Sequence, residues 1–281
     1  MSNIKRVSIV GCGWLGMPLG KFLVEKGWEV KGTTTTFEKV PQIQDMGMEG
    51  FYLQVAGGKI HGEWEEALDS ETLILNIPPR RRRDPNEAED YYHLRIKRLL
   101  NGLPHTPVKN ILFISSTSVY GSISGTVTEE TEGQPPFSAS AMSLLAVEQN
   151  LILSRFRTTI LRLGGLIGPG RHPVNFLAGR RSLTGGGEPV NLIHLTDCIG
   201  LIYRIIQHDT WGQIFHGSAA SHPLKADYYP EVARKKGLIP PDYQVDDTEP
   251  KGKIIDSTFT REYLDYQFKY DDPFEMEVMS S

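Results

Sequence analysis

A glycine-rich segment near the start of the chain limits the possible folds more than any other feature. The segment Gly11-Cys12-Gly13-Trp14-Leu15-Gly16 directly follows the apolar run Val7–Val10 and precedes a helical pattern over Met17–Lys26. In such a strand–turn–helix unit, the first glycine permits a tight turn and the second lets a pyrophosphate approach the backbone; the third lets helix and strand pack closely. The helix N-terminus offers unpaired N–H groups to the phosphates. The segment therefore predicts dinucleotide binding, and the alternative is a structural turn with incidental glycines.

The end of the second expected strand bears on which dinucleotide is bound. An NAD site usually has Asp or Glu there, about 20 residues after the glycines. Here the sequence reads Lys31-Gly32-Thr33-Thr34-Thr35-Thr36, and Glu29 lies at the other end of the strand. The absence of a carboxylate at this position favours NADP over NAD, and the threonine hydroxyls and Lys31 could bind the 2′-phosphate. The alternative is that the threonines only cap the next helix. The predicted cofactor-binding residues are Gly11, Gly13, Trp14, Leu15, Gly16, Thr33, Thr34, Thr35 and Pro78.

Short β-branched runs alternate with helical patterns, which predicts βα units and a parallel sheet. The expected strands are Val7–Val10, Trp28–Lys31, Phe51–Val55, Thr72–Ile77, Asn110–Ser115, Thr158–Leu163, Asn191–Ile193 and Gln213–His216. The expected helices are Met17–Lys26, Glu87–Leu103, Ala141–Ser154 and Asp197–Ile206. After residue 165, loops reading GPGRHP and SLTGGGEP interrupt the pattern. We therefore expect a nucleotide-binding domain over residues 1–165 and a smaller substrate lobe over 166–281, interleaved with the last strands.

Composition narrows the class of protein further. The 281 residues are 39% apolar and 23% charged with a net charge of −4, which fits an ordinary globular chain and argues against nucleic acid as a partner. No run of 18 apolar residues is present, and the start enters a strand without a signal-peptide pattern. Cys12 and Cys198 form neither a disulfide framework nor a metal pattern. These observations predict a cytoplasmic protein without a metal site.

Three further segments carry a family resemblance: ISSTSVYG at Ile114–Gly121, LRLGGLIGPG at Leu161–Gly170 and NLIHLTD at Asn191–Asp197. Together with GCGWLG, they resemble the extended short-chain dehydrogenase/reductase superfamily, in its epimerase/dehydratase branch, over about residues 5–220. The resemblance implies an α/β fold, a Rossmann-type doubly wound parallel sheet with a small interleaved C-terminal substrate lobe. It also implies an NAD(P)-binding oxidoreductase that acts on a sugar-like or anionic small molecule.

The resemblance assigns a catalytic role to Ser116, but the family's catalytic tyrosine and lysine are missing from this chain. The family has Ser or Thr four residues before the tyrosine of VYG, which implies that Ser116 hydrogen-bonds the substrate beside the nicotinamide; the alternative is a serine that caps a loop. The family's YxxxK pair falls on Ser140 and Leu144, and no lysine occurs between Lys109 and Lys225. The chain is therefore similar to atypical members that lack this pair, and Glu148 on the same helix has no catalytic role.

Two other residues could replace the missing proton relay. Tyr120 follows a parallel strand at the end where such folds bind ligands, so its phenol could act as an acid or pack beside the site. His172 lies in the loop Pro169–Pro173, where an imidazole could transfer protons near neutral pH or make a backbone hydrogen bond. His194 and Asp197 match a family pair that fixes the lobe, and Asp197 is expected to cap its helix.

Arginines supply the candidate substrate contacts. Arg80-Arg81-Arg82-Arg83 follow an expected strand end, where guanidinium groups could grip a carboxylate or phosphate; a solvated charge run is the alternative. Arg171, Arg180 and Arg181 add positive charge from the smaller lobe. Arg80 and Arg171 are therefore the predicted substrate-binding residues, and the ligand is expected to be anionic.

Two hypotheses about the function of the protein are compatible with the sequence. The first is an NAD(P)-dependent oxidoreductase with a non-standard catalytic site, which the cationic loops favour. The second is a non-catalytic NADP(H)-binding sensor or scaffold, which the missing Tyr–Lys pair favours. The helix Ala141–Ser154 is apolar on more than one side, which indicates either extra core burial or a homodimer interface.

Overall fold

The computed structural model describes residues 5–79, 92–132, 138–244 and 251–276. The chain forms two compact units that interleave in sequence. The first unit comprises Met1–Val119, Phe137–Leu161 and Ile205–Ile214, and the second comprises Tyr120–Pro136, Arg162–Arg204 and Phe215–Ser281. The domain boundary at residue 165 stays a prediction.

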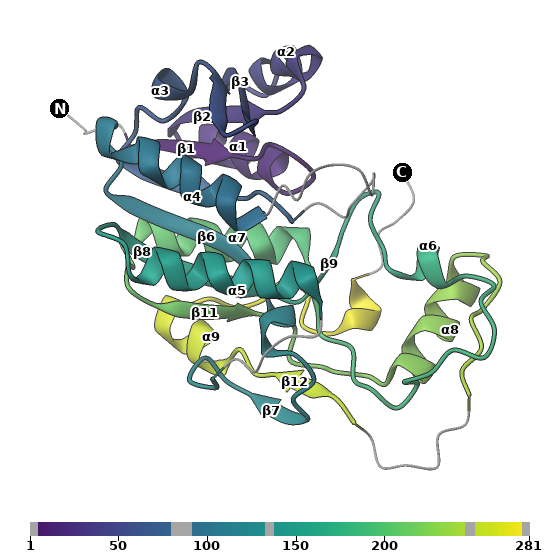
Figure 1. Cartoon of the computed structure of the whole chain (residues 1–281). Coiled ribbons are helices and arrows are strands. Elements are labelled where there is room, and N and C mark those ends of the chain that lie inside the picture. The colour runs from purple at the N-terminus through teal and green to yellow at the C-terminus, as the bar shows by residue number, and fades with distance from the viewer. Residues whose placement is uncertain (1–4, 80–91, 133–137, 245–250, 277–281) are drawn as a thin grey trace. The chain divides into compact units, whose positions relative to one another are not determined.

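A large, mostly parallel sheet confirms the predicted α/β fold (Figure 1). The strand order among the described residues is β11-β8-β6-β5-β1-β2-β3-β4. These strands are β1 (Arg6–Val10), β2 (Glu29–Thr34), β3 (Glu49–Ala56), β4 (Lys59–Gly62), β5 (Thr72–Leu75), β6 (Asn110–Ser116), β8 (Arg157–Leu163) and β11 (Ile214–Gly217). Strand β1 pairs in parallel with both β2 and β5, and β5 pairs in parallel with β6.

One strand of this sheet was not expected. β4 pairs antiparallel with β3, so that Val55 lies opposite Ile60. The sequence Lys59-Ile60-His61-Gly62 carries no apolar run because three of these four residues are exposed, and the fourth is half-buried. An edge strand of this kind lacks the continuous hydrophobic pattern that marks a strand buried on both faces.

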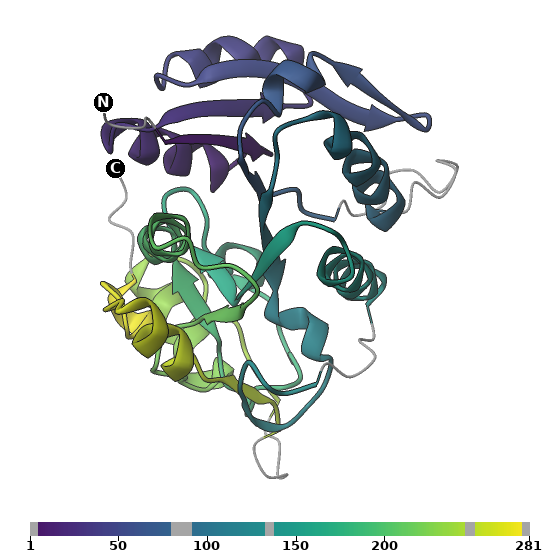
Figure 2. The same ribbon diagram turned by 90° about the vertical axis from the view of Figure 1, so that its left-hand side faces the viewer.

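Helices cover both faces of the sheet in the first unit. Figure 2 shows α4 (Tyr92–Gly102) and α5 (Ala139–Ile152) side by side on one face, with α1 (Gly16–Glu25) on the other. Helix α1 buries Leu19 and Leu23 completely, as its apolar stripe predicts. Helix α5 begins after Ser138, whose Oγ accepts the Ala141 N–H at 3.2 Å and so caps the helix. The shorter elements of this unit are η1 (Phe37–Lys39), α2 (Val40–Gln44), α3 (Trp64–Ala67) and η2 (Leu103–His105).

The second unit has small parallel sheets and short helices. β9 (Gly165–Ile167) pairs with β10 (Leu192–His194), and β7 (Gly125–Val127) pairs with β12 (Lys253–Ile255). Its core includes Ile167, Val190 and Tyr228. The remaining elements are η3 (Thr117–Tyr120), which begins in the first unit, α6 (Val174–Leu177), α7 (Leu195–Gln207), which ends in the first unit, α8 (Lys225–Lys235), α9 (Thr258–Leu264) and η4 (Pro273–Glu275). None of the helices in the described ranges is long and apolar enough to cross a membrane.

Candidate functional site

The glycine-rich segment lies where the strand order of the sheet reverses. β2 and β3 extend from one side of β1, and β5 and β6 extend from the other. The segment follows the carboxyl end of β1, and Asn76 follows the carboxyl end of β5. The Asn76 side chain donates from Nδ2 to the Gly11 carbonyl at 2.9 Å, and the Asn76 N–H donates to the Val10 carbonyl at 2.9 Å. The turn is thus tied to both strands at the switch point, where open α/β sheets bind their ligands.

The three glycines of this turn differ in the space around them. A Cβ on Gly11 would lie 2.3 Å from the Asn76 carbonyl oxygen, and Gly11 also has a φ of +109°. A Cβ on Gly16 would lie 2.3 Å from the Gly11 carbonyl oxygen. A Cβ on Gly13 would meet no atom of the described residues within 4 Å. The fold therefore excludes side chains at Gly11 and Gly16, whereas the space beside Gly13 remains open for a ligand.

The start of α1 offers hydrogen-bond donors to an anion. Within the described part of the chain, the backbone N–H groups of Leu15 and Gly16 have no hydrogen-bond acceptor. The helix has no side-chain cap and no acidic residue in its first turn. Unpaired N–H groups and the positive end of the helix dipole both favour a phosphate at this position. The residues present therefore fit the pyrophosphate of a dinucleotide.

The threonines at the end of β2 hydrogen-bond to the backbone of the protein. Thr33 is buried; its Oγ1 accepts the Gly11 N–H at 3.3 Å, and its carbonyl accepts the Cys12 N–H at 2.8 Å. Thr34 Oγ1 accepts the Thr36 N–H at 3.2 Å, and Thr35 is exposed. Thr33 thus holds the glycine turn in place, a role that its position in the sequence did not indicate.

Lys31 is already engaged by groups of the protein. Its Nζ donates to the Glu66 carbonyl at 3.0 Å and lies 3.6 Å from Glu49 Oε2 and 3.8 Å from Asp69 Oδ2. Two carboxylates therefore neutralise its charge, and a role in binding a 2′-phosphate finds no support. Pro78, the last predicted cofactor contact, is exposed two residues beyond Asn76.

Ser116 and Ser115 differ in environment at the end of β6. Ser115 is buried, and its Oγ donates to Glu148 Oε1 on α5 at 2.5 Å. Ser116 is half-buried, and its Oγ accepts the Ser118 N–H at 3.1 Å. The hydroxyl hydrogen of Ser116 has no acceptor in the described part of the chain. Ser116 can therefore donate to a ligand, whereas Ser115 and Glu148 hold β6 against α5.

Of the predicted arginines, the structure describes only those of the second unit. Arg171 is exposed in the second unit, as are Arg180 and Arg181. Arg80 and the three arginines after it lie outside the described residues. Whether Arg80 and Arg171 contact one ligand stays a prediction.

His172 is held in a buried hydrogen-bond chain. Its Nδ1 accepts the Val174 N–H at 3.1 Å, so the neutral ring carries its hydrogen on Nε2 and donates to the Tyr228 hydroxyl at 3.1 Å. The hydroxyl in turn donates to the Pro273 carbonyl at 3.3 Å. Burial, assisted by the positive charge of Lys236, lowers the pKa of His172 to about 4.

We predict that His172 stays neutral from pH 8 down to about pH 5, because burial disfavours its charged form. Long-range ¹H–¹⁵N spectra of the histidine rings will show no titration of His172 across this range. This pKa lies below that of an unfolded histidine, which is about 6.5. The contribution of His172 to the free energy of unfolding is therefore fully present above pH 6.5, and it is lost as the pH falls towards 4. A midpoint near 6.5 would contradict the buried arrangement.

His194 and Asp197 fix parts of the second unit. His194 Nδ1 accepts the Thr196 N–H at 3.2 Å, so the histidine provides the helix cap that the sequence assigned to Asp197. The Asp197 carboxylate instead accepts the Tyr266 hydroxyl at 3.0 Å and the N–H groups of Lys269 at 2.7 Å and Tyr270 at 3.1 Å. Asp197 therefore joins α7 to the segment after α9, and His194 caps α7.

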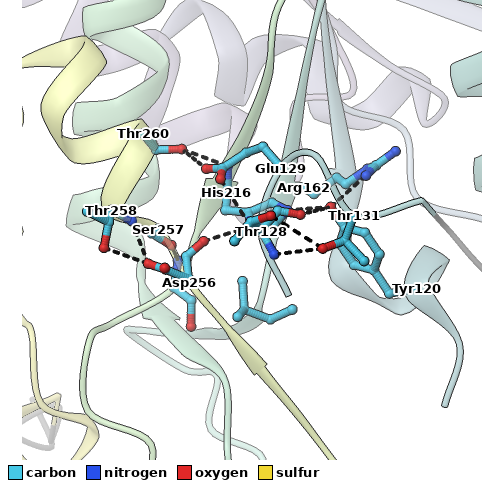
Figure 3. Close-up of polar contacts among 12 residues, drawn as sticks. Tyr120, Thr128, Glu129, Thr131, Arg162, His216, Asp256, Ser257, Thr258 and Thr260 are labelled. Atoms are coloured by element: carbon cyan, nitrogen blue, oxygen red, sulfur yellow. Dashed lines mark hydrogen bonds and ion pairs between the residues drawn. The ribbon is translucent and has the colours of Figure 1, made fainter. Parts of the chain in front are cut away.

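Tyr120 is completely buried and belongs to a polar cluster of the second unit (Figure 3). Its hydroxyl lies 2.5 Å from His216 Nε2 and accepts a hydrogen bond from Arg162 Nη1 at 2.6 Å. His216 was not predicted as a functional residue, and neither was Arg162. Their signal in the sequence is a charged or polar residue inside an apolar strand, since Arg162 interrupts the run Thr158–Leu163 and His216 ends the run Gln213–His216.

Comparison with known proteins identifies the family. No family model matches the chain. Protein YeeZ of Escherichia coli strain K12 is 36% identical over 276 residues, which cover 97% of this chain and 99% of YeeZ. The chain belongs to the YeeZ family.

Solved structures with the same fold support the predicted architecture of this YeeZ-family chain. A putative NAD-dependent epimerase/dehydratase from Methylobacillus flagellatus is 22% identical with a TM-score of 0.75, covering 98% of this chain and 96% of that protein. The Bordetella bronchiseptica enzyme WbmG, in complex with NAD, is 17% identical with a TM-score of 0.77 over 96% and 91% of the two chains. The Rossmann-type α/β fold of the YeeZ-family chain is therefore confirmed.

Proposed function

We propose that this YeeZ-family protein is an NAD(P)-dependent oxidoreductase of the epimerase/dehydratase type that acts on a sugar nucleotide or a similar anionic molecule. The observation that carries the proposal is the open space beside Gly13, next to unpaired N–H groups at the switch point. Solved structures of the same fold include MoeE5 in complex with UDP-glucuronic acid and NAD, at 17% identity and a TM-score of 0.76. A bound nicotinamide cofactor would supply or accept hydride, and the glycine turn would hold its pyrophosphate.

The proposed cofactor is NADP rather than NAD. The support is the end of β2, where Thr33 and Thr34 occupy the place at which an NAD site has a carboxylate for the ribose. Fluorescence titration with NADPH and NADH distinguishes the two, because a 2′-phosphate preference appears directly as a difference in Kd. Tighter binding of NADH would assign NAD instead.

Ser116 is the proposed catalytic residue, because its hydroxyl hydrogen has no acceptor among the described residues and can bond a substrate oxygen. Arg171 and Arg80 are the proposed contacts to an anionic group of the substrate. Tyr120 and His172 stay predictions as proton donors. Both are buried in hydrogen-bond networks, which favours holding roles over direct contact with a substrate.

Replacing Ser116 with alanine should reduce turnover by about 100-fold or more, because a positioned proton donor is worth roughly 10²–10⁴-fold. The reaction is followed by nicotinamide absorbance at 340 nm while UDP-sugars and small carbonyl compounds are offered with each cofactor. Ser118→Ala is the matched control, since the Ser118 backbone contact to Ser116 is retained. Equal turnover in Ser116→Ala and the unaltered protein would remove Ser116 from the mechanism.

The second candidate is an NADP(H)-binding sensor or scaffold without turnover. The burial of Tyr120 and His172 favours it, because neither side chain is exposed to a ligand in this structure. Tight NADPH binding with no absorbance change over the substrate panel would support the sensor. Turnover that depends on Ser116 would exclude it.

A homodimer and a cytoplasmic location complete the proposal. Helix α5 exposes Met142 and Ile152, each more than half exposed, although its opposite side is packed in the first unit. An apolar surface of this kind would pair with a second copy, and light scattering measures the oligomeric state.

The support for a cytoplasmic location is that Cys12 and Cys198 are free thiols, which a reducing compartment maintains.

A further inference from the structure

Four titratable side chains of the second unit meet in a buried cluster (Figure 3). Tyr120 and His216 have no exposed surface, Arg162 is 5% exposed, and the Glu129 side chain is 7% exposed. They come from η3, β8, β11 and the turn after β7. Burying charged groups is costly unless they are paired and hydrogen-bonded, so the arrangement of protons in this cluster must satisfy each group.

The contacts of His216 fix one arrangement of protons. Its Nδ1 lies 2.8 Å from the Asp256 carbonyl oxygen, which can only accept, so Nδ1 carries a hydrogen. In the neutral imidazole Nε2 is then an acceptor, and the Tyr120 hydroxyl donates to it at 2.5 Å. Arg162 Nη1 donates to the same hydroxyl oxygen at 2.6 Å. In this state the Tyr120 hydroxyl connects the guanidinium to the imidazole.

The same residues also accommodate a second arrangement. With a proton on His216 Nε2, the imidazolium would donate to the Tyr120 oxygen. The Tyr120 hydroxyl hydrogen would then turn to the Thr128 carbonyl oxygen, which already lies 3.3 Å away. No donor or acceptor named here loses its partner when the proton is added, so the change requires only a rotation of the hydroxyl.

A counter-ion for the second arrangement is already in place. Glu129 Oε2 lies 3.8 Å from His216 Nδ1, and Glu129 Oε1 accepts the Thr260 hydroxyl at 2.7 Å and the His216 N–H at 3.2 Å. Asp256, held by Thr258, adds a second negative charge near the ring, and Arg162 opposes protonation. Burial lowers the pKa of His216 below the usual value of a histidine, and the Glu129 carboxylate offsets part of this shift.

We propose that this cluster is a proton switch: in mild acid His216 takes up a proton, and the Tyr120 hydroxyl changes its acceptor from His216 to the Thr128 carbonyl. The switch alters the bonds that hold the turn Thr128–Thr131 while the unit stays folded. It does not depend on the proposed oxidoreductase activity. His172 provides an internal contrast, because its own hydrogen bonds, to the Val174 N–H and the Tyr228 hydroxyl among the described residues, involve no carboxylate, and the charge of Lys236 opposes its protonation.

The test is a histidine titration of the intact chain by long-range ¹H–¹⁵N spectroscopy between pH 8 and 4.5, with His216→Asn used to assign the His216 signals. We expect His216 to titrate reversibly at a higher pH than His172. In Glu129→Gln, which keeps an acceptor for Thr260, the His216 midpoint should fall by about one pH unit or more, because the counter-ion is lost. Glu231→Gln, at an exposed ion pair with Lys235, is the matched control and should leave the midpoint unchanged.

Two results would overturn the proposal. One is a His216 ring that stays neutral until the protein unfolds, and the other is an unchanged midpoint in folded Glu129→Gln. If that variant does not fold, the Tyr120 ring of the unaltered protein gives the answer. Its ¹³Cζ shift should follow the His216 titration curve with the same midpoint, and a shift that does not change with pH would equally overturn the switch.

Discussion

Replacing Gly13 with valine should raise the Kd for NAD(P)H by about 100-fold or more while the protein remains folded, a loss of about 2.7 kcal/mol of binding free energy. The reason is local. A Cβ on Gly13 would meet no atom of the described residues within 4 Å, but it would stand where the pyrophosphate of the proposed cofactor approaches the backbone. The measurement is a fluorescence titration with NADPH and NADH, accompanied by a thermal melt of each variant without ligand.

Gly11→Val is the matched comparison for Gly13→Val. At Gly11 the new Cβ would lie 2.3 Å from the Asn76 carbonyl oxygen on a backbone with φ of +109°, so this variant should lose stability as well as binding. Gly13→Val should keep the melting temperature of the unaltered protein. Unchanged affinity in Gly13→Val would refute the placement of the cofactor, and a large fall in its melting temperature would show that the glycine serves the fold.

The parts of the fold that could be predicted are those buried on both faces. Strands β1, β5 and β6 read as continuous apolar runs because helices cover both faces of the sheet, and their expected positions agree with the structure to within two residues. β4 and β12 could not be predicted in the same way. β4 is mostly exposed at an edge, and β12 has only three residues, of which Ile255 alone is buried.

The candidate site was predictable where backbone geometry defines it. The spacing of Gly11, Gly13 and Gly16 indicated the turn, and the structure leaves no room for a Cβ at Gly11 or Gly16. Asn76 was missed, since its function depends on β5 lying beside β1, which the sequence alone does not show. The cluster around Tyr120 was missed for the same reason: His216 is 96 positions away in the sequence.

Asp197→Ala should destabilise the protein by about 3 kcal/mol or more, measured as the free energy of unfolding in urea. The carboxylate is completely buried and accepts hydrogen bonds from the Tyr266 hydroxyl and from the Lys269 and Tyr270 N–H groups. Alanine would leave these three donors without an acceptor, and each buried unsatisfied group costs about 1–3 kcal/mol. The segment after α9 should lose its attachment to α7, which hydrogen exchange at Lys269 and Tyr270 would detect.

Asp197→Asn separates the loss of charge from the loss of contacts. Burial raises the pKa of Asp197, so the charged form is held in the protein at a cost that grows as the pH rises through this pKa. Asparagine removes that cost and keeps an oxygen in the Oδ1 position, which accepts from Tyr266 and Lys269; only the Tyr270 N–H loses its acceptor. The asparagine variant should therefore lose only about 1 kcal/mol near pH 7. Equal losses in the two variants would mean that the negative charge, rather than the three hydrogen bonds, holds α7 to the segment after α9.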